Sequence, residues 1–224
     1  MRVNNEADAP RRARGRPQVR SDEETRALIV EAAAGEFQTK GFAATCIADV
    51  AQQAGVSTKT LYRLIPTKAD LFESVVVDRI GRAAEEIEFE IGPDADPRQM
   101  IERLLIGFGD LTLEPGTIAI NRLVIGEGGN FPEIAKTFYE RAIVRTRQAM
   151  ERALARLCEL GLIELEDVAE AATMLRGMMI MDPQRAVMLG QSAAPDADAI
   201  RRRAQRCAAL FLHGCCSKKA GARA

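Results

Sequence analysis

The stretch AGVSTKTLY, residues 54–62, holds the side chains whose chemistry is most evident in this sequence. Thr58, Lys59, Tyr62 and the adjacent Arg63 are hydroxyls or cations at spacings that place them on one side of a helix. Hydroxyl, ammonium and guanidinium groups bind phosphate oxygens and the edges of bases. The stretch therefore predicts a surface that binds double-stranded DNA.

Patterns that would indicate catalysis or metal binding do not occur in the sequence. The five cysteines have no CxxC spacing, His213 is the only histidine, and HExxH, GxSxG, GxxxxGK and GxGxxG are all missing. We therefore predict that the chain is not an enzyme and holds no cofactor or metal. The alternative, an enzyme in the C-terminal half, has no pair of carboxylates and no nucleophile with a base to support it.

Charge is distributed unevenly along the chain, although the formal net charge is only -1. Residues 1–20 hold six arginines and two acidic residues, and residues 214–224 are basic. We expect a disordered arm and a flexible tail in these two segments. The letters RGRP in the arm resemble the core of an AT-hook, so Arg14 and Arg16 are predicted to enter a minor groove. A solvated arm that only adds solubility is the alternative.

The elements that must position these side chains are helices. Hydrophobic spacing is helical nearly everywhere, and no alternating run marks a strand, so the sequence predicts an all-α fold. Ser21 and Glu24 have the spacing of a capping box at the start of a first helix, which Gly41 ends. No run of 18 apolar residues occurs, so we expect no membrane span and a place in the cytoplasm.

A helix-turn-helix is predicted after Gly41. Thr45 is the candidate N-cap of a short helix that ends at Gly55, where a positive φ allows a sharp turn. Ser57 is the N-cap of the next helix, and Pro66 ends it. The exposed face of such a helix fits a major groove.

The residues from 69 to 213 are predicted to form a larger helical domain. A long helix runs from Thr67, and the longest runs from Pro132 to about Leu160. The last helix lies near residues 197–213.

The segments IVEAAAGEFQTKGF, residues 29–42, and AATCIADVAQQAGVSTKTLYRLIPTKADLF, residues 43–72, resemble the DNA-binding domain of TetR-type transcriptional regulators. The resemblance implies a helix-turn-helix DNA-binding domain at residues 21–68. Ile65 departs from the family pattern, which usually has an aromatic residue there, and Lys59 stands where a small residue is frequent. Lys59 could bind a guanine edge or a phosphate. The implied DNA contacts are phosphate contacts from Thr45, Tyr62 and Lys68, and base contacts from Ser57, Thr58, Lys59 and Arg63, with Thr60 beside them.

The resemblance also raises the possibility of a cavity for a small apolar or amphipathic effector in the larger domain. Methionines adapt to irregular apolar surfaces, although ordinary core filling is an equal alternative for them. The candidate lining residues are Phe108, Leu123, Phe131, Phe138, Tyr139, Met174, Met178 and Met181, with Asn121 and Arg122 as polar anchors.

The last two helices have narrow seams rich in alanine and cysteine, which predict close packing of two copies in a four-helix bundle. One recognition helix reads few bases, whereas a dimer places two of them on a palindrome. We therefore expect a homodimeric repressor of an operator palindrome that a small-molecule effector releases by tilting the helix from Thr67. An architectural DNA protein without an effector is the alternative. The predicted interface residues are Val168, Ala172, Leu175, Ile200, Ala204, Cys207, Ala208 and Phe211.

Overall fold

The computed structural model of the chain describes residues 20–87 and 91–214. Within these ranges it is all-α without a strand, as predicted. Arg14 and Arg16 of the arm and residues 215–224 of the tail lie outside the described residues. The helices are α1 Asp22–Ala44, α2 Ile47–Gln53, α3 Thr58–Leu64, α4 Lys68–Ile87, α5 Pro97–Leu113, α6 Pro115–Glu127, α7 Pro132–Phe138, α8 Arg145–Glu159, α9 Val168–Met188 and α10 Ala197–Gly214, with a π-helical segment, η1 Tyr139–Val144, between α7 and α8.

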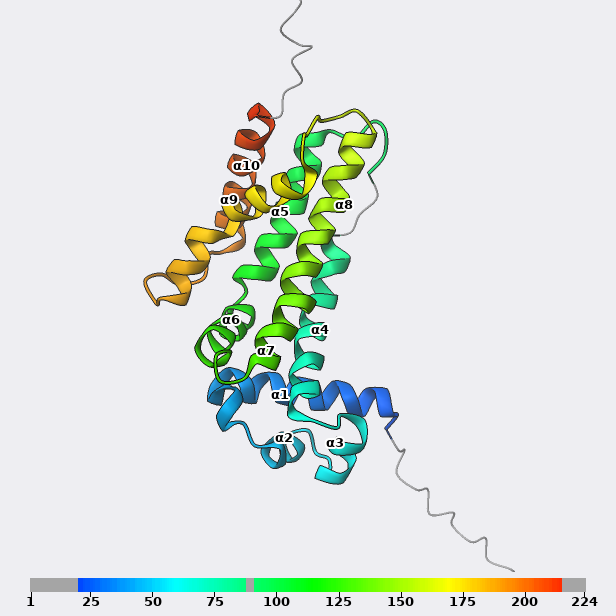
Figure 1. Cartoon of the computed structure of the whole chain (residues 1–224), viewed down its shortest axis with the longest axis vertical. Coiled ribbons are helices and arrows are strands. Elements are labelled where there is room, and N and C mark those ends of the chain that lie inside the picture. The colour runs from blue at the N-terminus through cyan, green and yellow to red at the C-terminus, as the bar shows by residue number, and fades with distance from the viewer. Residues whose placement is uncertain (1–19, 88–90, 215–224) are drawn as a thin grey trace, which may run out of the picture.

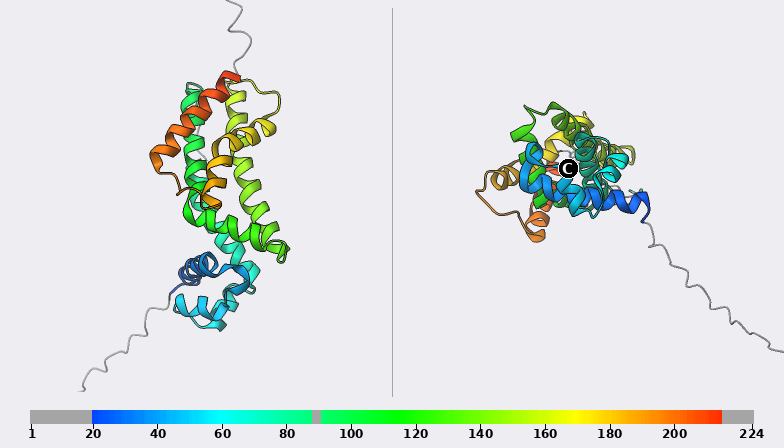
Figure 2. Two further views of the ribbon diagram at one scale, coloured as in Figure 1. Left: turned by 90° about the vertical axis from the view of Figure 1, so that its left-hand side faces the viewer. Right: turned by 90° about the horizontal axis from the view of Figure 1, so that it is seen from below.

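The three N-terminal helices form a small unit at one end of the molecule. In Figure 1, α1 lies across this end with α2 and α3 beyond it, and α4 leads from α3 into the larger helical part. The side view in Figure 2 shows α5–α10 gathered into an elongated bundle above the small unit. The predicted architecture, a small N-terminal three-helix part joined to a larger helical part, is therefore confirmed.

Capping groups fix where α1 begins and ends. The Glu24 N–H donates to Ser21 Oγ at 3.1 Å, and the Glu24 carboxylate accepts from the Ser21 N–H at 2.8 Å, which is the predicted capping box. Gly41 has φ 80° and ψ 176°, a conformation available mainly to glycine. The helix is interrupted there, and only one further turn, residues 42–44, follows.

The prediction that Thr45 is the N-cap of α2 is wrong. Cys46 occupies the N-cap position and makes no side-chain cap hydrogen bond. The Thr45 hydroxyl instead donates to the carbonyl of Gly41 at 2.6 Å, and the side chain is buried. The break at Gly41 leaves carbonyl groups without regular helical partners, and Thr45 satisfies one of them.

The chain is helical without interruption from Pro132 to Glu159, in agreement with the single long helix predicted there. The π-helical turn η1 lies in its middle, which a sequence pattern of period 3.6 does not anticipate. The Thr146 hydroxyl donates to the carbonyl of Ala142 at 2.8 Å just beyond this turn.

A proline in the interior of α9 is accommodated by an arginine of α10. Pro183 has no N–H, so the carbonyl four residues earlier, that of Met179, lacks its helical hydrogen bond. Arg203 Nε donates to the Met179 carbonyl at 2.6 Å, and Nη2 donates to the Met178 carbonyl at 2.8 Å. These bonds join α9 to α10.

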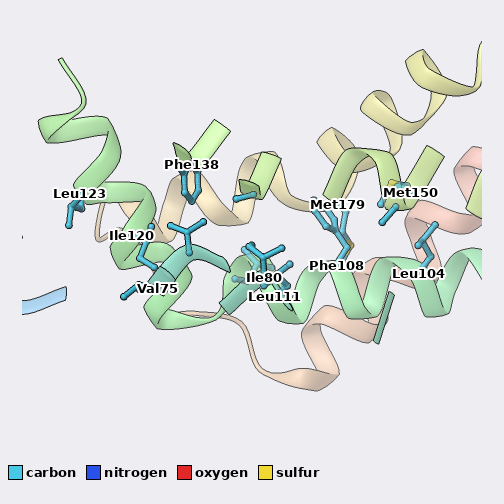
Figure 3. Close-up of a cluster of buried hydrophobic side chains, with 14 of the residues drawn as sticks. Val75, Ile80, Leu104, Phe108, Leu111, Ile120, Leu123, Phe138, Met150 and Met179 are labelled. Carbon is cyan, nitrogen blue, oxygen red and sulfur yellow. The ribbon is translucent and has the colours of Figure 1, made fainter. Parts of the chain in front are cut away.

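The core of the larger part is built from the apolar faces of α4 to α10. Phe108 of α5 is completely buried, and Figure 3 shows it beside Met179 of α9. Ile80 of α4 and Leu111 of α5 lie side by side in the same view. Among the described helices, none has the length and apolar character needed to cross a membrane.

Candidate DNA-binding surface and effector site

The turn between α2 and α3 fixes the orientation of α3. Gly55 has φ 67°, which permits the sharp reversal, and Ser57 Oγ accepts from the Thr60 N–H at 3.1 Å to begin α3. Leu61 and Ile65 are completely buried. Ile65 therefore fills its core position without an aromatic ring, and the opposite face of α3 points to solvent.

That outward face carries the predicted DNA-binding side chains. Thr58, Lys59 and Arg63 are exposed, and Tyr62 is 50% exposed despite its large ring. Thr60 is partly buried, and its hydroxyl lies 2.9 Å from Ser57 Oγ. The face offers hydroxyls and cations at the spacing of a helix in a major groove. The contacts of the individual side chains with DNA remain predictions.

Arg63 is held by an acidic residue at the start of α1. Its Nη1 and Nη2 donate to the two carboxylate oxygens of Asp22 at 2.8 and 2.6 Å. The hydrogen bond from Arg63 lowers the pKa of the Asp22 carboxyl, so this carboxylate is charged at neutral pH. If Arg63 contacts DNA as predicted, Asp22 would compete with DNA for the guanidinium.

We expect Asp22→Asn to raise DNA affinity by about 2–5-fold at low salt, because Arg63 no longer has to leave a charged partner. Fluorescence anisotropy with a labelled duplex measures this change. Glu23→Gln, which removes the same charge from the neighbouring exposed residue, is the control. An equal gain in both variants would show that net charge, and not the release of Arg63, is responsible.

Two residues predicted to contact phosphates are engaged inside the protein. The hydroxyl of Thr45 is hydrogen-bonded to Gly41, as described above. Lys68 Nζ donates to the Ala43 carbonyl at 3.1 Å and lies 4.9 Å from the centroid of the Phe42 ring. Burial lowers the pKa of Lys68, and the negative charge of Glu127 opposes this change. Each side chain would have to give up an internal contact to reach a phosphate.

A carboxylate at the end of α6 joins the two parts of the molecule. The two oxygens of Glu127 accept hydrogen bonds from the backbone N–H groups of Phe42 at 2.9 Å and Ala43 at 2.6 Å. Both groups directly follow the break at Gly41. The sequence carries no signal for this role of Glu127, because its partners lie 84 and 85 residues away and no local pattern connects them.

An aromatic cluster packs around the same junction. The Phe42 ring centroid is 5.0 Å from that of Phe131, 5.7 Å from that of Phe37 and 5.9 Å from that of Phe72. Phe131 belongs to the turn between α6 and α7, whereas the other rings belong to α1 and α4. The junction therefore connects the end of α1 to α6 as well as to α4.

A cavity of about 110 Å³, partly open to solvent, lies in the larger part and is bordered by α4, α5, α6, the helix through η1 and α9. Its wall is apolar on several sides and also carries amides, hydroxyls and one guanidinium. The lining residues are Ile80, Leu111, Thr112, Thr117, Asn121, Phe138, Ala142, Ile143, Thr146, Arg176, Ile180 and Gln184.

Few of the residues predicted to line an effector pocket line this cavity. Of the predicted residues, Asn121 and Phe138 line the cavity. Phe108 and Leu123 are buried in the core elsewhere, and Phe131 belongs to the junction.

The other predicted pocket residues face outward. The Arg122 guanidinium donates to the carbonyls of Val187 and Met188 at the end of α9. Met178 lines an external groove between α9 and α10. Each of the remaining three is more than half exposed: Tyr139, Met174 and Met181. Apolar residue type alone did not show which way these side chains point.

The predicted dimer seam faces the core of its own protomer. α10 packs on α5, and the small residues of α9 and α10 permit this close approach. The prediction that these faces of α9 and α10 are free to meet a second copy is therefore wrong. Val168 is partly buried, and the buried residues of the seam are Ala172, Leu175, Ile200, Ala204, Cys207, Ala208 and Phe211.

Fold and site together define a helix-turn-helix protein whose small N-terminal domain is attached to a helical domain with a cavity. Residues 29–75 match the bacterial regulatory proteins of the tetR family, and residues 99–214 match the C-terminal domain of AefR-like transcriptional repressors. The chain belongs to the TetR family of transcriptional regulators. The resemblance noted in the sequence is thereby confirmed.

Similar proteins agree with this assignment. The HTH-type transcriptional regulator TtgR of Pseudomonas putida is 33% identical over 109 residues, which cover 46% of this chain and 50% of TtgR. The probable HTH-type transcriptional regulator ArpR, also of Pseudomonas putida, gives the same identity and coverage. The aligned part of the chain thus spans about half the length of these relatives.

Solved structures share the fold. A TetR transcriptional regulator from Agrobacterium tumefaciens superposes with a TM-score of 0.74 at 18% identity, covering 90% of this chain and 98% of that chain. The Flavonoid-responsive Regulator FrrA gives a TM-score of 0.71 at 23% identity, covering 88% and 99% respectively.

Proposed function

We propose that the protein is a homodimeric repressor, acting on the chromosome in the cytoplasm, that binds an operator palindrome and leaves it when a small molecule binds the cavity. The observation that carries this proposal is the continuity between the two sites. α6 contributes Thr117 and Asn121 to the cavity wall and ends at Glu127, which holds the last turn of α1. FrrA, named a flavonoid-responsive regulator and of the same fold, supports a response to small molecules.

Two-fold pairing is supported by the outward faces of α9 and α10. Met174, Gly177 and Met181 follow one another at helical spacing on the side of α9 opposite its buried face. Leu210 on α10 is 67% exposed. A helix that is apolar on two opposite sides needs a second covering layer, and a second copy of the same helices would provide it.

Effector binding would change the distance between the two copies of α3. A ligand that enlarges the cavity pushes on α4, α6 and α9, and both α4 and α6 are attached to α1. The ligand must bind the state released from DNA more tightly than the DNA-bound state. Glu127 and the Phe42 cluster are the contacts through which α6 would move the DNA-binding domain.

We expect Glu127→Gln to loosen this contact, because an amide has one acceptor oxygen where the carboxylate has two. Hydrogen exchange at the Phe42 and Ala43 amides should become at least about tenfold faster, since a bond to a charged acceptor contributes about 1.5–3 kcal/mol. Glu133→Gln on α7 is an exposed control and should leave both amides unchanged. Unaltered exchange in Glu127→Gln would mean that the contact does not hold α1.

Selection of bound fragments from sheared genomic DNA tests the proposed function. A repressor should enrich a palindrome and bind it about 10³-fold or more tightly than random duplex. Competition with nonspecific DNA measures that ratio. Equal binding to operator and random DNA would favour the architectural protein without an effector and would contradict the repressor.

A further inference from the structure

Arg176 on α9 contains a buried donor without a hydrogen-bond partner. Its Nε is shielded from solvent and makes no hydrogen bond to any described residue. The ion pairs within the described part of the chain do not include Arg176 either. The Arg176 side chain as a whole is partly buried. A guanidinium keeps its charge inside a protein, and leaving its buried Nε without a partner is costly. The side chain therefore requires an explanation.

The neighbours of Arg176 compensate its charge only in part. Its Cζ lies 5.2 Å from the centroid of the Phe108 ring, a cation–π contact. Burial lowers the pKa of Arg176, the charge of Arg147 lowers it further, and Glu151 acts in the opposite direction. Glu151 is itself 3.5 Å from Arg147 Nε. Of these two charged neighbours, one is positive and one is negative, and the carboxylate is paired with Arg147, so together they do not neutralise Arg176.

The other polar groups of the cavity do not supply a negative charge. The hydroxyls of Thr112 and Thr146 donate to carbonyls of their own helices at 2.7 and 2.8 Å. Gln184 Nε2 donates to the Thr112 carbonyl at 3.3 Å. Among the described residues that line the cavity, Arg176 is the only charged one. The polar side of the cavity is therefore suited to an anion.

The size of the cavity limits the ligand. Its volume is about 110 Å³, and an apolar cavity of roughly 150 Å³ in a protein can hold benzene. Ile80, Leu111, Phe138 and Ile180 provide the apolar wall. A ligand with about one ring fits with small adjustments of these side chains, whereas a molecule of several rings requires the helices to separate.

We propose that Arg176 binds the carboxylate of a monocyclic organic acid whose apolar body fills this cavity. That such an acid is the effector rests on the proposed function. That Arg176 binds it does not. Arg176 donates two hydrogen bonds to the carboxylate, and Phe108 supports the other face of the guanidinium. Because Nε is shielded from solvent, the guanidinium turns slightly so that Nε donates to the carboxylate, which becomes the partner that Nε lacks.

Isothermal titration calorimetry of the full chain without DNA, with benzoate and its neutral analogue benzamide as probes, tests the site. The wild type should bind benzoate about 10- to 100-fold more tightly than benzamide, because the bonds to the carboxylate are charge-assisted. Arg176→Met should lose this preference and keep its affinity for benzamide. Arg185→Met, an exposed position on the same helix, should behave as the wild type. A wild type that binds benzoate no better than benzamide, or an Arg176→Met protein that retains the preference, would overturn the proposal.

Two further measurements make the outcome independent of folding and of DNA binding. Arg176→Met should have a melting temperature without ligand at least equal to that of the wild type, because it removes an unsatisfied buried donor. Arg176→Lys keeps the charge without the paired donors and should retain only part of the preference for benzoate; full retention would contradict the two-bond geometry.

Operator binding is measured separately. An Arg176-dependent preference for benzoate in a chain that binds no operator would refute the repressor and leave the acid site standing. Operator binding without that preference would refute the acid site and leave the repressor standing.

Discussion

A protein carrying Met181→Glu together with Leu210→Glu is expected to be monomeric and to bind its operator at least about 100-fold more weakly than the wild type. Both side chains are more than half exposed in the protomer, so a carboxylate there costs the protomer fold little. In a two-fold interface the same substitutions place four carboxylates between apolar helices, where they would be desolvated without partners. A single α3 then contacts only half of a palindrome. Light scattering after size exclusion and fluorescence anisotropy measure the two effects.

The control for this experiment carries the same added charge elsewhere. Ile125 and Tyr139 are 72% and 55% exposed and lie on α6 and η1, outside the α9–α10 face. The Ile125→Glu, Tyr139→Glu protein should remain dimeric and bind DNA as a dimer. Dimers of undiminished affinity in the Met181, Leu210 variant would show that two copies meet through another surface.

Phe42→Ala is expected to lower the free energy of unfolding by about 3–5 kcal/mol, the usual cost of removing a buried phenyl ring. Phe42 is only 4% exposed, contacts the rings of Phe37, Phe72 and Phe131, and lies under Lys68 Nζ. The cavity left behind lies where α1, α4 and α6 meet. Urea unfolding followed by circular dichroism measures the loss, and hydrogen exchange should show α1–α3 opening before the rest of the chain.

Phe131→Ala is the comparison for this variant. Its ring is partly buried and packs on Phe42 from the α6–α7 side. We expect a smaller loss of stability and little change in hydrogen exchange within α2 and α3. If Phe131→Ala were as destabilising as Phe42→Ala, then Phe42 would not be the centre of the junction.

The helix-turn-helix could be predicted almost completely, because its signals are local. Ser57 caps α3 through an N–H three residues away, and Gly55 supplies the positive φ of the turn by itself. The match of residues 29–75 to the family follows from the same short-range pattern. Thr45 failed as an N-cap because a carbonyl four residues before it had no partner after the break at Gly41.

The effector site and the dimer faces could not be predicted in the same way. α9 has apolar residues on two opposite sides, so periodicity identifies a helix without telling which side meets the core. Packing against the rest of the protomer assigned Ala172, Leu175 and Met179 to the interior and left Met174 and Met181 outside. Arg176 carried no sequence signal, because an arginine on a helix is ordinarily solvated.

The sequence by itself determined the helices, the N-caps of α1 and α3 and the polar face of α3, since each depends on residues within about one turn of the chain. Only the tertiary structure decided which apolar faces are covered, which carboxylate holds the last turn of α1, and which cation enters the cavity. The physical reason is distance along the chain. Glu127 meets amides 84 and 85 residues away, and the burial of Arg176 depends on α4, α5, α6 and α8 packing around α9.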